Sequence, residues 1–117
     1  MPSAKQTLGR WGEAQGGAFL ERHGFKIITQ NFHTTRGEVD IVAKKGDDFY
    51  FVEVKTRRAG PLATDLAITK LKRRRLEKAA AAYSVQHNIS GENAFCASLF
   101  VIYSATTKQV KFRFITA

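Results

Sequence analysis

The alternation of apolar and polar residues along the chain predicts two helices and five strands. Apolar side chains recur at helical spacing from Lys5 to His23, and Gly24 ends this helix. A second helix is predicted to begin at Thr64 or Asp65 and to run to about Asn88. The strands are predicted over Phe25–Phe32, Glu38–Lys44, Phe49–Thr56, Phe95–Tyr103 and Val110–Ile115.

Short turns connect the first three strands, at Arg36-Gly37 and again from Lys45 to Asp48. Two such connections in succession indicate an antiparallel meander. The order α-β-β-β-α-β-β therefore predicts an α/β fold with one mixed central sheet flanked by helices. We expect a single domain over residues 1–117, with residues 1–5 flexible.

The first helix is unusually rich in glycine. Each glycine costs on the order of 1 kcal/mol relative to alanine in a helix, so four of them require a reason. Gly9, Gly16 and Gly17 share a side of the helix with Glu13, and small residues let a helix approach a sheet or a DNA strand closely. The large aromatic side chains are expected in the core rather than as platforms for bases; these are Trp11, Phe19 and Tyr83.

A carboxylate, Glu53, interrupts the most apolar strand, and burying it requires a positive partner. Alternation places Glu53 and Lys55 on one face of their strand, and Glu38 and Asp40 share a face of the neighbouring strand. A hairpin around Gly46 would pair residues whose numbers sum to about 93, which sets Asp40 opposite Glu53. Two carboxylates suit Mg²⁺, with the lysine orienting water. The alternative is a salt-bridge cluster that only closes the end of the sheet.

The second helix carries six basic residues among the nine from Lys70 to Lys78. Helical spacing puts Lys72 at the head of the core-facing stripe that continues with Leu76, Ala79, Ala80 and Tyr83. Lys72 would then aim at the carboxylates, or alternatively extend to solvent. Lys70, Arg74 and Lys78 point away from the core, where a phosphate backbone could lie.

The net charge of +9 favours a polyanionic partner, and nucleic acid is the commonest one. A ribosome-associated or simply well-solvated protein is the alternative. No run of 18 apolar residues predicts a membrane span, and Met1 to Arg10 lacks the apolar core of a signal peptide. Cys96 is the only cysteine, which excludes an internal disulfide and a cysteine-based zinc site. We expect a cytoplasmic protein with no membrane partner.

Several short motifs occur in an order and spacing that are specific together. They are Gly9-x-x-Gly12-Glu13, Gly24-Phe25-x-Ile27-Ile28-x-x-Asn31-Phe32, Arg36-Gly37-Glu38-Val39-Asp40, Phe51-Val52-Glu53-Val54-Lys55-Thr56-Arg57, and Lys72 with Arg75-Leu76 and Ala79-Ala80-x-x-Tyr83. In this arrangement the chain resembles the YraN family of small bacterial proteins. That family belongs to the restriction-endonuclease-like superfamily and is related to archaeal Holliday-junction resolvases.

The resemblance implies the αβββαβ nuclease core and assigns roles to individual residues. Asp40 and Glu53 would be the primary metal ligands, with the Val54 backbone carbonyl as a third. Lys55 would orient the attacking water or stabilise charge. Glu13 matches an acidic residue that related resolvases contribute from the first helix, unless it is only an exposed helical glutamate.

Two further residues beside this site receive predicted roles. Lys72 would join the catalytic group through the second helix. Glu38 is expected to serve the entry of its strand instead, with Arg36 as its partner.

The resulting hypothesis is a Mg²⁺- or Mn²⁺-dependent endonuclease that hydrolyses DNA, with branched or single-stranded DNA as substrates. The residues expected to contact DNA are Arg57, Lys70, Arg74 and Lys78. A homodimer follows by analogy with junction-cutting enzymes, and a helicase or recombination protein would be a further partner. The alternatives are a non-catalytic nucleic-acid-binding module with a nuclease fold and an RNA-associated basic protein.

Overall fold

A computed structural model describes residues 3–61 and 70–116 of the chain. Its elements are α1 (Ala4–Arg22), β1 (Lys26–Thr34), β2 (Gly37–Lys45), β3 (Asp48–Arg58), α2 (Lys70–Gln86), the short 3-10 helix η1 (Gly91–Asn93), β4 (Ala94–Tyr103) and β5 (Val110–Thr116). The predicted order of helices and strands is confirmed. The predicted start of the second helix at Thr64 or Asp65 lies outside the described residues.

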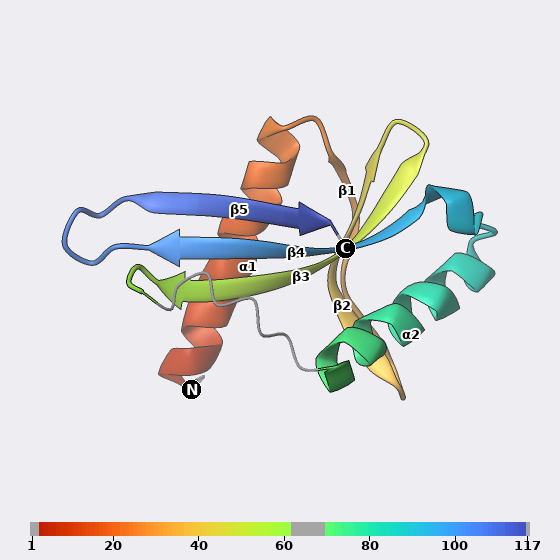
Figure 1. Cartoon of the computed structure of the whole chain (residues 1–117), viewed down its shortest axis with the longest axis horizontal. Helices are drawn as coiled ribbons and strands as arrows, with labels where there is room; N and C mark the ends of the chain where they lie inside the picture. The colour runs from red at the N-terminus through yellow and green to blue at the C-terminus, as the bar shows by residue number, and fades with distance from the viewer. Residues whose placement is uncertain (1–2, 62–69, 117) are drawn as a thin grey trace.

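The five strands form one sheet in the order β1-β2-β3-β4-β5. Neighbouring strands are antiparallel except for β3 and β4, which are parallel, so the predicted mixed sheet is confirmed. Figure 1 shows α1 crossing behind β3, β4 and β5, while α2 lies beside β2. No helix within the described ranges is long and apolar enough to span a membrane.

Local signals explain where α1 begins and ends. The Ser3 hydroxyl accepts a hydrogen bond from the Gln6 N–H (3.1 Å), and the Gln6 side chain accepts one from the Ser3 N–H (2.9 Å). This reciprocal capping box satisfies two backbone donors that the helix itself leaves free. The helix therefore begins at Ala4, inside the segment expected to be flexible. It ends before Gly24, whose φ of +86° suits glycine.

Two glycines of α1 allow the helix to lie close to the sheet. A Cβ atom on Gly12 would overlap the Thr56 hydroxyl, and one on Gly16 would lie 3.0 Å from Leu99 Cδ2. Gly9, which we grouped with the glycines of close approach, differs from both. A Cβ on Gly9 would have no atom within 4 Å.

Each face of the sheet carries its own apolar cluster. The cluster under α1 consists of Leu20, Ile41, Ala43, Val52, Ala97, Leu99 and Val101, with Trp11 and Phe19 packed against it. The cluster under α2 consists of Val39, Val42, Phe51, Leu76, Ala79, Ala80 and Tyr83. The predicted core-facing stripe of α2 and the expected packing roles of the three aromatic residues are confirmed.

Candidate active site

The candidate site lies where β2 and β3 separate. Five residue pairs join them, from Lys45↔Asp48 to Ile41↔Val52, and the two residue numbers of each pair sum to 93 as predicted. The ladder ends there, one pair short of the predicted pairing of Asp40 with Glu53. Beyond that point, among the described strands, β2 continues to pair with β1 alone and β3 with β4 alone. We call this separation the fork. Figure 1 shows the start of β2 turning away from β3 and lying beside α2.

Asp40 occupies the first position of the fork. Its Oδ2 accepts a hydrogen bond from the Val54 N–H at 2.8 Å, so a side-chain oxygen takes the place of a strand carbonyl. A residue's N–H and C=O point to the same edge of a strand, so the Val54 carbonyl also faces the fork. This hydrogen bond joins the backbone of β3 to the Asp40 carboxylate on β2.

A hollow of about 280 Å³ opens at the fork. Its lining residues are Glu38, Asp40, Glu53, Val54, Lys72, Arg75 and Leu76, and we call it the carboxylate hollow. The structure therefore brings together Asp40, Glu53 and Lys72, which the sequence assigned to one site. They come from three different elements, namely β2, β3 and α2.

Lys55 is buried beside Glu53. Its ammonium nitrogen lies 3.7 Å from Glu53 Oε1, which forms an ion pair on the face that strand alternation predicts. Burial lowers the pKa of Lys55, the nearby Glu53 opposes that change, and Lys72 and Arg57 lower the pKa further. Lys55 thus lies near one negative group, Glu53, and two positive ones, Lys72 and Arg57.

Glu13 reaches the same electrostatic environment from α1. It is half-buried, and burial raises its pKa, with Glu38 raising it further and Arg10 opposing. Glu13 does not line the carboxylate hollow, but its charge acts on Asp40. Glu13 is therefore not a freely exposed helical glutamate, and its role at the metal site stays a prediction.

Among these carboxyl groups, the pKa of Asp40 is the one most strongly raised. Burial raises its pKa to about 6, and the charges of Glu13, Glu53 and Glu38 add to the rise, while the hydrogen bond from Val54 opposes it. At neutral pH the site therefore concentrates negative charge in a partly buried place. Such a place attracts a cation.

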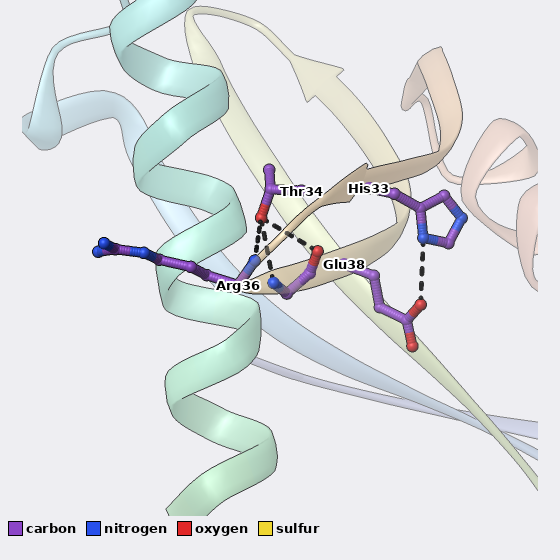
Figure 2. Close-up of polar contacts among 5 residues, drawn as sticks. His33, Thr34, Arg36 and Glu38 are labelled. Atoms are coloured by element: carbon purple, nitrogen blue, oxygen red, sulfur yellow. Dashed lines mark hydrogen bonds and ion pairs between the residues drawn. The ribbon is translucent and has the colours of Figure 1, made fainter.

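The turn between β1 and β2 fixes how α2 approaches the fork. The Thr34 hydroxyl accepts hydrogen bonds from the N–H groups of Arg36 and Gly37, both at 3.1 Å (Figure 2). A Cβ on Gly37 would overlap the backbone carbonyl of Arg75. Glycine at this position therefore lets the first turns of α2 lie directly over the start of β2.

Glu38 has a different partner from the one expected. His33 Nδ1 lies 3.3 Å from Glu38 Oε2, and both side chains are largely exposed, whereas Arg36 extends away from Glu38 (Figure 2). The expected pair of Glu38 with Arg36 is wrong. His33 and Glu38 are directly paired across β1 and β2, while Arg36 belongs to the turn.

A second hollow of about 230 Å³ adjoins the first. Its lining residues are Lys5, Leu8, Gly9, Glu53, Val54, Lys55, Thr56, Arg57 and Lys72, and we call it the basic hollow. Glu53, Val54 and Lys72 line both hollows. Arg57, predicted to contact DNA, lines the basic hollow, and its Nη1 donates to the Thr56 carbonyl at 3.2 Å.

The remaining predicted DNA contacts lie on α2 outside both hollows. Lys70, Arg74 and Lys78 are exposed, on the side of α2 that faces away from the sheet, as predicted. They are separated from the carboxylates by the body of the helix. Their charges remain available to a partner along this helix.

The donor atoms at the fork fit a hard divalent ion that keeps bound water. No group of three or more His, Cys, Asp or Glu side chains in residues 3–61 and 70–116 is arranged to hold a metal. Two carboxylates, Asp40 and Glu53, and the Val54 carbonyl supply oxygen atoms, and Mg²⁺ is commonly held by one or two carboxylates with waters. Such a donor set suits a divalent ion that keeps several of its waters, and not an ion that needs a closed protein cage.

Sequence reasoning missed the residues that shape the site without carrying its chemistry. The sequence gives one indication of the role of Gly37, namely a glycine directly before Glu38. Its contact with Arg75 could not be predicted, because that contact depends on how α2 packs on the sheet. Lys5 and Gly9 were not assigned to the site, because their approach to β3 depends on the whole α1–sheet contact. Arg75 appeared only as part of a motif.

Comparisons with known proteins identify the family. A model of the family described as "Uncharacterised protein family UPF0102" matches residues 12–114. A UPF0102 protein of Geobacter sulfurreducens is 47% identical over 90 residues, covering 76% of this chain and 70% of the relative. One from Syntrophomonas wolfei is 46% identical over 79 residues, covering 67% of this chain and 69% of the relative.

A solved structure shares the fold. It is that of Archaeoglobus fulgidus Hjc, a Holliday junction resolvase from an archaeal hyperthermophile. The match has a TM-score of 0.52 at 16% identity and covers 92% of this chain and 76% of the resolvase. The chain thereby shares the fold of that protein. The family resemblance read from the sequence is confirmed: the chain belongs to the UPF0102 family, also called YraN.

Proposed function

We propose that this protein is a divalent-metal-dependent endonuclease that hydrolyses phosphodiester bonds of DNA. The observation that carries the proposal is the fork, where Asp40 and Glu53 line one hollow together with Lys72. Where β2 and β3 separate, their facing backbone groups give up the hydrogen bonds of the ladder. The separation does create room for a phosphate and a cation beside a lysine.

Asp40, Glu53 and the Val54 carbonyl would hold the metal ion. The raised pKa of Asp40 supports this assignment, because an uncompensated excess of carboxylates is what a divalent cation relieves. A bound Mg²⁺ or Mn²⁺ would polarise a phosphoryl oxygen and make a bound water more acidic. Glu13 would add negative charge from α1 without contacting the hollow directly.

The lysines would act on the phosphate and on the water. Lys55 is held by Glu53 in a buried position, from which its ammonium stabilises charge that develops on the phosphate or orients the attacking water. Lys72 lines both hollows and would neutralise a phosphate oxygen. Hydrolysis would leave a 5′-phosphate and a 3′-hydroxyl.

The basic residues outside the carboxylate hollow would hold the DNA. Lys70, Arg74, Lys78 and Arg57 offer cationic groups that contact phosphates without reading sequence. The solved relative in fold is named for Holliday junctions, which supports branched DNA as one substrate to test. Cutting two strands of a junction would require two copies of the site, hence a homodimer.

One observation favours a second candidate function. The Lys55–Glu53 ion pair would also be expected in a module that binds nucleic acid without cutting it, with Lys55 only compensating a buried carboxylate. That module would bind the same DNAs but would not hydrolyse them.

The decisive experiment is a cleavage assay on linear, flapped, single-stranded and four-way-junction DNAs with Mg²⁺ or Mn²⁺. We expect cleavage of at least one DNA, and none by Asp40→Ala. Asp40→Asn, which keeps the size of the side chain, controls for loss of folding. A wild type that binds these DNAs and cuts none of them would establish the binding module instead.

A further inference from the structure

The basic hollow continues the carboxylate hollow on the other side of Glu53. The two spaces share Glu53, Val54 and Lys72, so Glu53 borders two openings, while Asp40 lines the carboxylate hollow alone. A polymer strand can therefore extend from the candidate metal site in two directions. A site for the end of a chain would be closed on one side.

The charge of the basic hollow suits a phosphodiester. Four basic side chains line it, namely Lys5, Lys55, Arg57 and Lys72, against a single acid, Glu53. The Arg57 guanidinium is oriented by its hydrogen bond to the Thr56 carbonyl. An oriented guanidinium retains donors for a phosphate, because it carries five N–H groups in total.

The backbone of β3 offers a further donor on the same side. The Val54 N–H points toward β2, as its bond to Asp40 establishes. Strand geometry directs the Thr56 N–H, two residues on, to the same edge, where β2 no longer pairs with β3. The Thr56 N–H therefore faces the basic hollow, which Thr56 lines.

Packing against neighbouring residues does not require a glycine at position 9. Gly12 and Gly16 contact the sheet, whereas a Cβ on Gly9 would meet nothing within 4 Å. Glycine disfavours a helix interior relative to alanine, so the chain keeps an unfavourable residue at a position where the fold has room for a larger one. That room is the basic hollow, which Gly9 lines.

We propose that the basic hollow binds the backbone phosphate next to the one that is cleaved. The substrate is then a DNA strand that continues on both sides of the cut bond. The inference rests on the proposed function and adds to it a subsite made by Lys5, Arg57 and the Thr56 N–H, kept open by Gly9.

Variants of Gly9 test the subsite without removing any side chain of the protein. Gly9→Ala and Gly9→Gln should both raise the urea midpoint of unfolding, because both residues favour a helix over glycine. They should at the same time weaken binding to a labelled single-stranded DNA in EDTA. We expect a loss of roughly tenfold for Gly9→Gln and a smaller loss for Gly9→Ala. A purely structural role of Gly9 predicts no loss of affinity.

Matched variants control for helix propensity and for charge. Gly17→Ala should stabilise α1 with no change in affinity, because an added Cβ there also meets nothing within 4 Å and Gly17 does not line the hollow. Arg57→Gln should reduce the slope of log K against log salt by about 0.7, the value of one lost phosphate contact on single-stranded DNA. Lys111→Gln, on β5, removes the same charge and should leave affinity nearly unchanged. Wild-type affinity in Gly9→Gln would overturn the proposal.

Cleavage of a closed circle of single-stranded DNA separates this inference from the proposed function. A wild type that cuts the circle, with weaker cutting by Gly9→Gln, supports both. Cutting of linear strands alone, with the circle intact, refutes a strand that continues on both sides. If the wild type cuts nothing, the proposed function fails, and the Gly9 affinities still decide whether the basic hollow holds a phosphate.

Discussion

The two halves of the β2–β3 hairpin differ in pairing and in the side chains that they carry. In the half nearest the turn, Ile41 to Lys45 pair with Asp48 to Val52, and the inner side chains join the two apolar clusters. In the other half the strands separate, and their side chains include Asp40, Glu53 and Lys55. The paired half is ordered by burial of apolar surface. The open half keeps its shape through contacts with other elements, since β2 pairs there with β1 and β3 pairs with β4.

Removing Lys55 should have the largest effect on the open half. Lys55→Met keeps much of the side-chain volume, and we expect cleavage to fall roughly a thousandfold if the ammonium acts in the transition state. Without divalent metal, stability should fall by up to about 3 kcal/mol, because Glu53 loses the cation that compensates its partial burial, and Mn²⁺ should restore part of that loss. Cleavage assays and urea unfolding measure the two effects. A variant that cuts at the wild-type rate would refute the catalytic role.

Gly37→Ala should disturb the contact that holds the open half in place. The new Cβ would overlap the Arg75 carbonyl, and two backbones would have to move apart. We expect a loss of roughly 3 kcal/mol in the free energy of unfolding. Gly60→Ala is the matched control, since nothing lies within 4 Å of its Cβ. Equal stability of the two variants would mean that α2 does not depend on this contact.

The pH dependence of stability should come from the open half. The folded pKa of Asp40, about 6, exceeds its unfolded value of 3.8, so the folded state holds the proton more tightly. Without divalent metal, stability should therefore fall as pH rises from about 4 to about 6, by at most about 3 kcal/mol, and level off above. Asp40→Asn should flatten this profile, as measured by urea unfolding at a series of pH values.

Divalent metal should reverse that loss. Mn²⁺ at neutral pH should raise the melting temperature of the wild type, since an ion that binds only the folded state stabilises it. The same addition should have no effect on Asp40→Asn. An equal shift in both proteins would place the ion elsewhere.

Neutralising the outer side of α2 should have the smallest effect and leave the fork intact. With Lys70, Arg74 and Lys78 all changed to Gln, duplex DNA of any sequence should bind more weakly. The slope of log K against log salt should decrease by about 2 to 3. Fluorescence anisotropy across a salt series measures this slope. No change would show that this side of α2 faces away from the DNA.

The sequence predicts the paired half well and the open half only in part. The register follows from local alternation and a short turn around Gly46, both visible in the chain. The fork is not visible, because it arises when β3 continues along β4 and β2 continues along β1, a choice made by distant segments. The carboxylates were identified because Glu53 violates the apolar pattern of its strand. Glu38 was given the wrong partner because nearness in sequence was taken for nearness across the ladder.

The parallel pairing of β3 with β4 has a consequence for how the chain assembles its site. Strands β1, β2 and β3 follow one another through tight turns, so their contacts are local and close at little entropic cost. The contact between β3 and β4 must first close the long segment that contains α2, and such distant pairings form slowly. We expect Asp40, Glu53 and Lys55 to be brought together early, with Lys72 arriving when α2 docks. The acids would then be in place before the hollow that encloses them exists.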